Sequence, residues 1–125
     1  LMLFLSLLFS SLFAAECEIP FPLKNKDKSL SEYCVVSEKV YEIGHIRFIN
    51  LPRAREKSDV WPYSYTYFAA TTETRNKLCQ LHKAKKELPR SHIYDPMAEN
   101  IQYSRQGFNI TPLRKTIKVL ACSLL

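Results

Sequence analysis

The last third of the chain reads Glu87-Leu88-Pro89, Ile93-Tyr94 and Pro96-Met97-Ala98-Glu99-Asn100-Ile101-Gln102-Tyr103, followed by Gly107, Ile110-Thr111-Pro112 and Cys122. Apolar and polar residues alternate here over short distances, and turn-forming residues separate the segments. The pattern predicts short strands at about residues 100–103, 107–110 and 116–122.

The preceding part of the chain combines a helical pattern with further strands. Apolar residues recur at three- and four-residue spacing, namely Leu30, Tyr33, Cys34, Val40 and Tyr41. This spacing predicts a helix over about residues 31–43 that Gly44 ends. Alternation at Ile46 and Phe48 and the aromatic run 61–68 predict strands, whereas residues 78–86 fit either a helix or a loop. One N-terminal helix packed on a twisted antiparallel sheet, an α+β fold, is therefore the expected class.

The first 15 residues differ in composition from the rest of the chain. Residues 1–13 are apolar apart from three serines, and Ala14-Ala15 precede the first acid, Glu16. The pattern is typical of a secretory signal peptide, and it is too short for a membrane span of about 20 residues. We therefore expect a leader over residues 1–15, a mature domain over residues 16–125, secretion, and no membrane anchor.

Four cysteines follow the expected leader: Cys17, Cys34, Cys79 and Cys122. Their even number and wide spacing, with no CxxC pair and no Cys/His cluster, favour two disulfides in an oxidising compartment over a metal site. The residues alone leave three connectivities open. One of these, Cys17–Cys122 with Cys34–Cys79, would tie the ends of the mature domain together.

The chain carries a formal net charge of +6, which favours polyanionic partners but also aids solubility. Bases stack on aromatic rings and phosphates attract cations, so aromatic residues in a basic chain suggest RNA binding. The candidates are Trp61, Tyr63, Tyr65, Lys83, Lys85, Lys86, Arg90 and Arg105. The alternative is that the tyrosines simply pack a sheet while the cations are solvated.

The order and spacing of the last third resemble the catalytic half of the small guanyl-specific fungal ribonucleases. In that family the run is Glu-(Trp/Phe)-Pro, Val-Tyr, Pro-Gly-Ala-Asp-Arg-Val-(Ile/Val)-Phe, Gly, Ile-Thr-His and a closing Cys. The resemblance covers about residues 61–122 and implies a ribonuclease-like domain over residues 16–125. It also implies that Glu87 matches the family's general base and that Asn100 stands where the family has its phosphate-binding Arg. Pro112 stands in place of the general-acid His, and Tyr63 in place of a further His.

Most of the chemistry of that family is missing at these positions. Proline has no proton to donate, and asparagine donates a hydrogen bond without a charge. Because a positioned general acid or base contributes about 10²- to 10⁴-fold in rate, we expect a pseudoenzyme in which Tyr63, Glu87, Asn100 and Pro112 are vestigial. Two alternatives are a surface role for Glu87 and an active ribonuclease in which His82 or His92 replaces the lost histidines.

The chain also resembles the ribonuclease-like effectors that powdery mildew fungi secrete into plants. In that group a Cys shortly after the leader pairs with one near the C-terminus, which implies Cys17–Cys122 and Cys34–Cys79 here. An aromatic residue usually stands two positions before the first Cys, where this chain has Ala15. The resemblance implies a virulence effector that enters host tissue and binds host RNA or host protein.

We further expect a monomer without cofactor or metal, which could be delivered into host cells. A disulfide-stabilised extracellular ligand or toxin of unrelated fold is the competing hypothesis, and a secreted inhibitor belongs to the same class. Asn109-Ile110-Thr111 is an N-glycosylation sequon, but Pro112 directly after it disfavours modification.

Overall fold

The structure is a computed structural model that describes residues 17–89 and 91–125. The expected α+β fold with an N-terminal helix is wrong, because the described residues are mostly strand and form a closed six-stranded barrel beside a five-stranded sheet. Within them the single α-helix is α2 (Thr72–Leu81), which lies in the second half of the chain. The expected leader, residues 1–15, lies outside the described residues.

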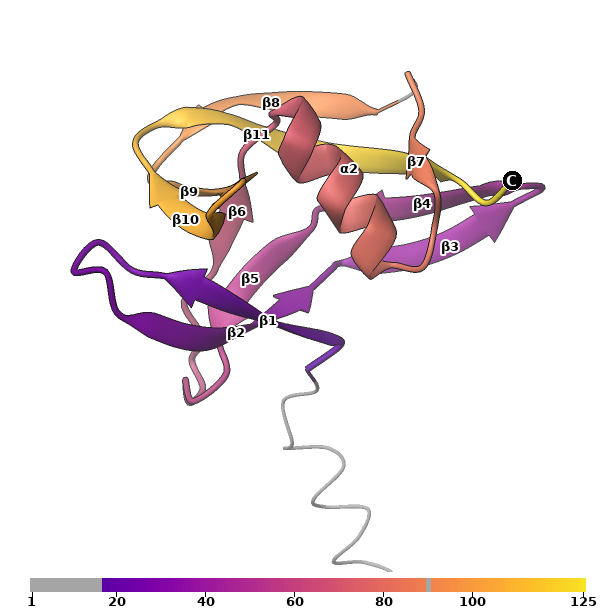
Figure 1. Cartoon of the computed structure of the whole chain (residues 1–125). Helices are drawn as coiled ribbons and strands as arrows, with labels where there is room; N and C mark the ends of the chain where they lie inside the picture. The colour runs from indigo at the N-terminus through magenta and orange to yellow at the C-terminus, as the bar shows by residue number, and fades with distance from the viewer. Residues whose placement is uncertain (1–16, 90) are drawn as a thin grey trace, which may run out of the picture.

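The barrel is built from strands of both halves of the chain (Figure 1). Its order is β1-β10-β9-β6-β5-β2, and the β1/β10 and β6/β9 pairs are parallel whereas the other pairs are antiparallel. The strands are β1 (Ile19–Lys24), β2 (Leu30–Val36), β5 (Arg53–Glu56), β6 (Thr66–Phe68), β9 (Asn100–Ser104) and β10 (Gly107–Thr111). Phe21, Phe68 and Phe108 fill the interior, with ring centres 4.7 to 6.1 Å apart.

The five-stranded sheet is organised around β11 (Arg114–Ser123). Along one edge of β11 lies β4 (Ile46–Asn50), which in turn pairs with β3 (Lys39–Ile43). Along the other edge lie β7 (Lys86–Glu87) and β8 (His92–Met97), beside different parts of β11. The next strand after β4 is β5, so the hairpin β3/β4 leads directly into the barrel.

Residues 31–43, expected to be a helix, are strands β2 and β3 with a break at Ser37-Glu38. Val35 and Val36 are β-branched and Tyr33 is aromatic, and such residues suit a pleated, half-buried surface. Pairing of β2 with β1 and β5 buries Val35, which a solvent-exposed helix face would not do. Gly44, expected to end the helix, has a φ of 61° and starts the two-residue turn of the β3/β4 hairpin.

The later strands were predicted well, since β9, β10 and β11 begin and end close to the expected positions. The aromatic run 61–68 is strand only at Thr66–Phe68, and the charged segment that begins at Arg53 forms strand β5. The ambiguous segment 78–86 is divided between the end of α2 and the start of β7.

Helix α2 is fixed to both sheets by polar and covalent contacts. Thr71 caps its N-terminus by accepting a hydrogen bond from the Thr74 amide, and Thr74 in turn accepts one from the Tyr103 amide of β9 at 2.9 Å. Leu78 and Cys79 are fully buried in the core between the helix and the sheet. No helix in the described ranges has the length and apolar character needed to span a membrane.

The described residues contain two disulfides, as the cysteine count predicted, but the expected pairing is wrong. Cys17 pairs with Cys34, where it joins the start of β1 to β2, and Cys79 pairs with Cys122, where it joins α2 to β11. Cys17–Cys122 and Cys34–Cys79 are not formed because Cys34 lies on a barrel strand and Cys122 on the sheet beneath α2. Two disulfides are consistent with an extracellular protein.

Candidate functional site

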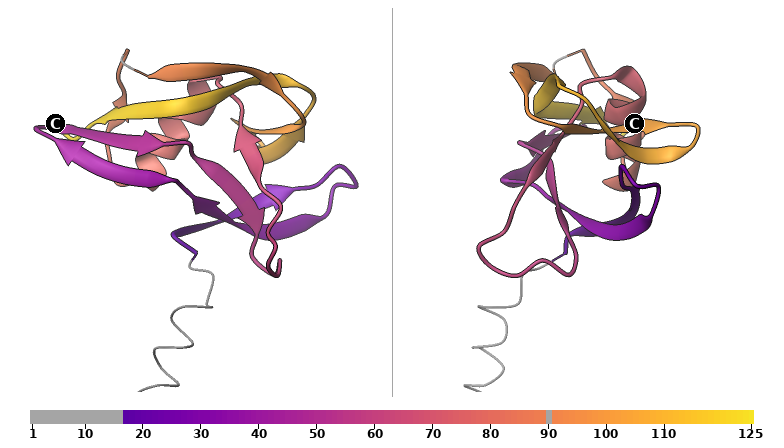
Figure 2. Two further views of the ribbon diagram at one scale, coloured as in Figure 1. Left: turned by 180° about the vertical axis from the view of Figure 1, so that it is seen from behind. Right: turned by 90° about the vertical axis from the view of Figure 1, so that its left-hand side faces the viewer.

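One face of the five-stranded sheet is covered by α2 and the other is open. Figure 1 shows α2 in front of β11, and the left view of Figure 2, from behind, shows β3, β4 and β11 in front of the helix. We call the uncovered side the open sheet face. Strand pairing and alternation place on it Lys39, Tyr41, Phe48, His92, Tyr94 and Val119. The irregularity in β11 between Ile117 and Val119 lets the neighbouring Lys118 reach the ring of Tyr94.

The aromatic floor of the open sheet face is formed by Tyr41 and Phe48, which are paired across β3 and β4. Their ring centres are 5.2 Å apart and the rings are inclined by only 19°. Their neighbours along the strands, Glu42 and Arg47, form an ion pair, and Arg47 donates to the carbonyl of His82 at the end of α2. Alternation along each strand therefore sends the aromatic residues to the side away from the helix.

A hollow of about 490 Å³ lies on this floor. It is lined by Tyr41, Phe48, Pro89, Ser91, His92 and Val119. The Ser91 hydroxyl accepts a hydrogen bond from the Ala121 amide at 3.1 Å, which fixes the segment between β7 and β8 against β11. His92 lies opposite Val119, so its imidazole stands at the wall of the hollow.

Two lysines flank the hollow. The Lys39 ammonium lies 5.0 Å from the centre of the Tyr41 ring, and the Lys118 ammonium lies 5.3 Å from the centre of the Tyr94 ring. Contacts at these distances are cation–π interactions, which hold the lysine side chains near the rings. The open sheet face thus combines aromatic surface with positive charge around one concave region.

Most side chains that line the hollow on the open sheet face are aromatic or aliphatic. No group of three or more metal-ligating side chains occurs in the part of the chain that the structure describes. The acid–base residue in the hollow is His92, and the other lining side chains are aromatic, aliphatic or hydroxyl-bearing. RNA cleavage by attack of the 2'-hydroxyl on phosphorus needs a base at the 2'-hydroxyl and an acid at the leaving 5'-oxygen, and the imidazole of His92 could fill one of these two roles.

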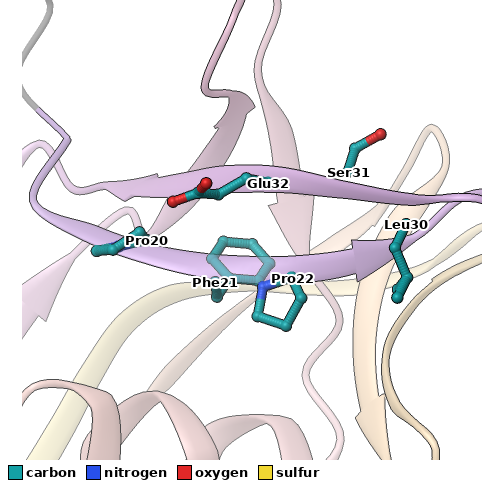
Figure 3. A pocket seen from close by; sticks show the side chains of 6 residues that line it. All are labelled: Pro20, Phe21, Pro22, Leu30, Ser31 and Glu32. Carbon is teal, nitrogen blue, oxygen red and sulfur yellow. The ribbon is translucent and has the colours of Figure 1, made fainter.

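A second hollow, of about 380 Å³, lies on the outer surface of the β1/β2 hairpin (Figure 3). Its lining is Pro20, Phe21, Pro22, Leu30, Ser31 and Glu32. Pro22 lies opposite Glu32 and Lys24 lies opposite Leu30, so these side chains share the outer face while Phe21 and Leu23 fill the barrel. This hollow is mainly apolar, with Lys24 on the same outer face and Lys57 paired with the lining residue Glu32.

The position that matches the catalytic base is separated from the position that matches the arginine. Glu87 pairs with Cys122 near the end of β11, and its carboxylate faces the Arg75 guanidinium at 3.2 Å. Asn100 Oδ1 accepts from the Arg114 amide at 2.7 Å, at the start of β11. The strand between these points spans about 26 Å at roughly 3.3 Å per residue, so the two side chains do not act on one phosphate.

Pro112 and Tyr63 lie at the same end of the barrel as Asn100. Pro112 follows Thr111, which pairs with Asn100, and the loop that holds Tyr63 leads into β6, whose Tyr67 also pairs with Asn100. None of the three carries a carboxylate, an imidazole or a guanidinium group. Asn100 is fully buried, which identifies it as a structural residue that holds the β10–β11 turn.

The expected RNA-binding residues do not form one surface. Trp61, Tyr63 and Tyr65 lie in the loop between β5 and β6, at the opposite end of the barrel from Arg105, which follows β9. Lys83 and Lys85 lie between α2 and β7, and Lys86 is the first residue of β7; the Lys85 amide donates to the Ser123 carbonyl at the far end of β11. Arg90 lies outside the described residues.

The tyrosines of the β5–β6 loop contact barrel arginines. Cζ of Arg55 lies 4.6 Å from the Tyr63 ring centre, and Cζ of Arg53 lies 4.3 Å from that of Tyr65. One face of each ring is therefore already covered by a guanidinium of the same chain.

The helix expected over residues 31–43 hides the open sheet face, because it includes Tyr41. The sequence nevertheless contains a hairpin signal: strand-forming residues at Val40, Tyr41 and Ile43 precede Gly44-His45, and the alternating segment Ile46-Arg47-Phe48 follows. That signal would have placed Tyr41 and Phe48 on one face.

Comparison with models of known protein families, with curated proteins and with solved structures found no match to this chain.

Proposed function

We propose that this chain is a secreted, non-enzymatic protein that binds single-stranded RNA on the open sheet face. The observation that carries the proposal is the nearly parallel Tyr41/Phe48 pair in a hollow flanked by Lys39 and Lys118. Proteins that bind single strands without strict sequence preference combine aromatic platforms for bases with cations that follow the backbone.

A single strand fits the site better than a duplex or a neutral sugar. The bases of a duplex are stacked on one another, so they cannot reach rings at the floor of a hollow. A neutral sugar would gain nothing from the two lysines, whereas each phosphate of a single strand gains from a nearby cation. The proposed ligand therefore presents an exposed base to Tyr41 or Phe48 and adjacent phosphates to Lys39 and Lys118.

The proposed biological setting is that of a fungal effector that reaches host tissue and binds host RNA. Secretion is supported by the apolar leader and by the two disulfides. Action without catalysis is supported by the separation of Glu87 from Asn100 and Pro112. Binding RNA without cleaving it would protect the RNA from host nucleases.

The experiment is fluorescence anisotropy with an end-labelled single-stranded RNA of about ten nucleotides, within the usual range of site sizes. The variants Tyr41→Ala and Phe48→Ala are each expected to weaken binding by roughly 5- to 150-fold, because stacking of one base contributes about 1–3 kcal/mol. Tyr65→Ala is the matched control, since it removes a partly exposed aromatic ring from the β5–β6 loop.

Two results would overturn the proposal. One is wild-type affinity for RNA in both open-face variants, and the other is loss of affinity in Tyr65→Ala alone. Incubation of the oxidised protein with RNA tests the non-enzymatic part, where specific cleavage that is lost in His92→Gln would indicate a ribonuclease instead.

A further inference from the structure

The barrel presents an exposed apolar projection and an apolar hollow next to each other. The projection is the tip of the β5–β6 loop, where the exposed fractions of Val60 and Trp61 are 75% and 79%. The hollow is the one on the β1/β2 hairpin, where Leu30 is 73% exposed. Large apolar side chains with this exposure, gathered at one end of a small protein, are typical of interaction surfaces.

The projection has a fixed shape. The Asp59 carboxylate accepts hydrogen bonds from the amides of Val60 and Ser64, both at 3.0 Å, and so closes the tip of the loop. At the base of the loop the Asp59 amide donates to the Glu56 carbonyl at 3.0 Å, and the ring of Tyr63 is stacked on Arg55. A loop held in this way loses little conformational freedom when Trp61 is buried by a partner.

The hollow offers an apolar surface of suitable size for an indole ring. Figure 3 shows Pro20 and Pro22 on β1 beside Leu30 on β2, with Glu32 at the rim. A volume of about 380 Å³ is sufficient for a large aromatic side chain. Proline rings and Trp side chains are both rigid, so their contact also costs little conformational entropy.

The projection and the hollow are neighbours. Lys57, at the start of the loop, forms an ion pair with Glu32 at 3.1 Å, and its amide donates to the Glu32 carbonyl. A shallow depression that Ser31, Glu32, Lys57 and Ser58 line continues from the hollow towards the loop. Because the projection and the hollow lie on one surface, a two-fold axis beside them brings the projection of each copy to the hollow of the other.

We propose that this chain forms a symmetric dimer in which Trp61 of each copy enters the Pro20/Pro22/Leu30 hollow of the other. A second copy occupies the hollow because each copy supplies both an apolar projection and an apolar hollow, so the dimer leaves neither exposed. The exchange is reciprocal, so the interface closes at two copies instead of extending into a filament. The open sheet face remains available on both copies.

The test is sedimentation velocity of the oxidised protein over a range of concentrations, together with the emission maximum of Trp61, the single tryptophan of the chain. Wild type is expected to change from monomer to dimer as concentration rises, with a shift of the emission to shorter wavelength. Trp61→Ala and Leu30→Glu are each expected to raise the dimer dissociation constant by roughly 30-fold or more, as loss of a central aromatic anchor does.

Both variants alter exposed side chains, so both should fold. Ile43→Glu, at the exposed tip of the β3/β4 hairpin, is the control for an added charge and should dimerise normally. A mixture of Trp61→Ala with Leu30→Glu should associate more tightly than either variant alone, because one intact Trp61 then meets one intact hollow.

Monomer at every concentration would overturn the proposal. A dimer that both substitutions leave unchanged would overturn it as well, since the interface would then lie elsewhere. Oligomers that continue to grow with concentration would contradict the closed, reciprocal arrangement. These readouts do not involve RNA, so they are independent of the proposed function.

Discussion

The rings of Tyr41 and Phe48 lie 5.2 Å apart on neighbouring strands, on the face of the sheet that α2 leaves uncovered. The two-residue turn at Gly44-His45 fixes the register that places them opposite each other. The opposite face of the same hairpin is fixed by Arg47, which binds both Glu42 and the end of α2. The aromatic floor is therefore formed before any ligand binds.

Removing the lysines of the open sheet face should reduce the salt dependence of RNA binding. A plot of the logarithm of the binding constant against the logarithm of the salt concentration has a negative slope. Lys39→Gln and Lys118→Gln are each expected to reduce the magnitude of this slope by about 0.7, because each neutralised phosphate of a single strand releases counterions. Anisotropy titrations between about 50 and 200 mM salt measure the slope. Lys83→Gln is the control, and a larger change in that variant would place the phosphate contacts near α2 and β7.

Introducing the catalytic residues of the guanyl-specific ribonucleases should not create a ribonuclease. Asn100 is fully buried, so Asn100→Arg places an unpaired charge in the interior and is expected to destabilise the fold by on the order of 3–5 kcal/mol. Combining it with Pro112→His adds no cleavage, since Glu87 stays at the other end of β11. Chemical denaturation measures the loss of stability in Asn100→Arg, and an RNA digestion assay measures cleavage by the double variant. Cleavage by the double variant that depends on Glu87 would contradict the prediction.

Acidification should lower the stability of the fold because His82 is buried. Burial lowers the pKa of His82, whose Nδ1 lies 2.8 Å from the Leu78 carbonyl while Nε2 is buried without a hydrogen-bond partner. Because the pKa is lower in the folded state than the usual 6.5, the unfolded state binds more protons, and stability is lost as the pH falls below about 6.5.

Denaturation of His82→Gln between pH 5 and 8 (the approximate range in which histidine titrates) should show a weaker pH dependence than wild type. His45→Gln, at an exposed position, should retain the wild-type dependence. Equal pH profiles for wild type and His82→Gln would contradict the assignment.

Opening the disulfide between α2 and β11 should destabilise the protein more than opening the one at the start of the barrel. The Cys79–Cys122 bond spans 43 residues and Cys17–Cys34 spans 17. The chain-entropy model gives about 4 and about 3 kcal/mol for loops of these lengths. Paired Cys→Ala variants and denaturant unfolding measure the difference, and peptide mapping without reduction checks the pairing, which a Cys17–Cys122 peptide would refute.

The sequence allowed the local features of the second half to be predicted. Residues 100–122 alternate in polarity between turn residues, and β9, β10 and β11 follow that alternation. The even number of cysteines predicted two disulfides, which the structure confirms. These features depend on neighbours in the chain, so local patterns are sufficient to predict them.

Residues 31–43 show where local patterns fail. The spacing of Leu30, Tyr33 and Cys34 fits a helix as well as it fits a strand next to a turn. The choice is made by β1 and β5, which pair with β2 from both sides, and by β4, which pairs with β3. Tertiary pairing therefore overrides the helical spacing.

Local patterns in the sequence predict a strand-rich second half and two disulfides, and both features are present in the structure. Closure of the barrel, the bond between Cys79 and Cys122, and the meeting of Tyr41, Phe48 and His92 at one hollow arise only when the chain folds. Strand pairs form between distant segments, so the register of each pair, and not the spacing within a segment, sets which side chains meet.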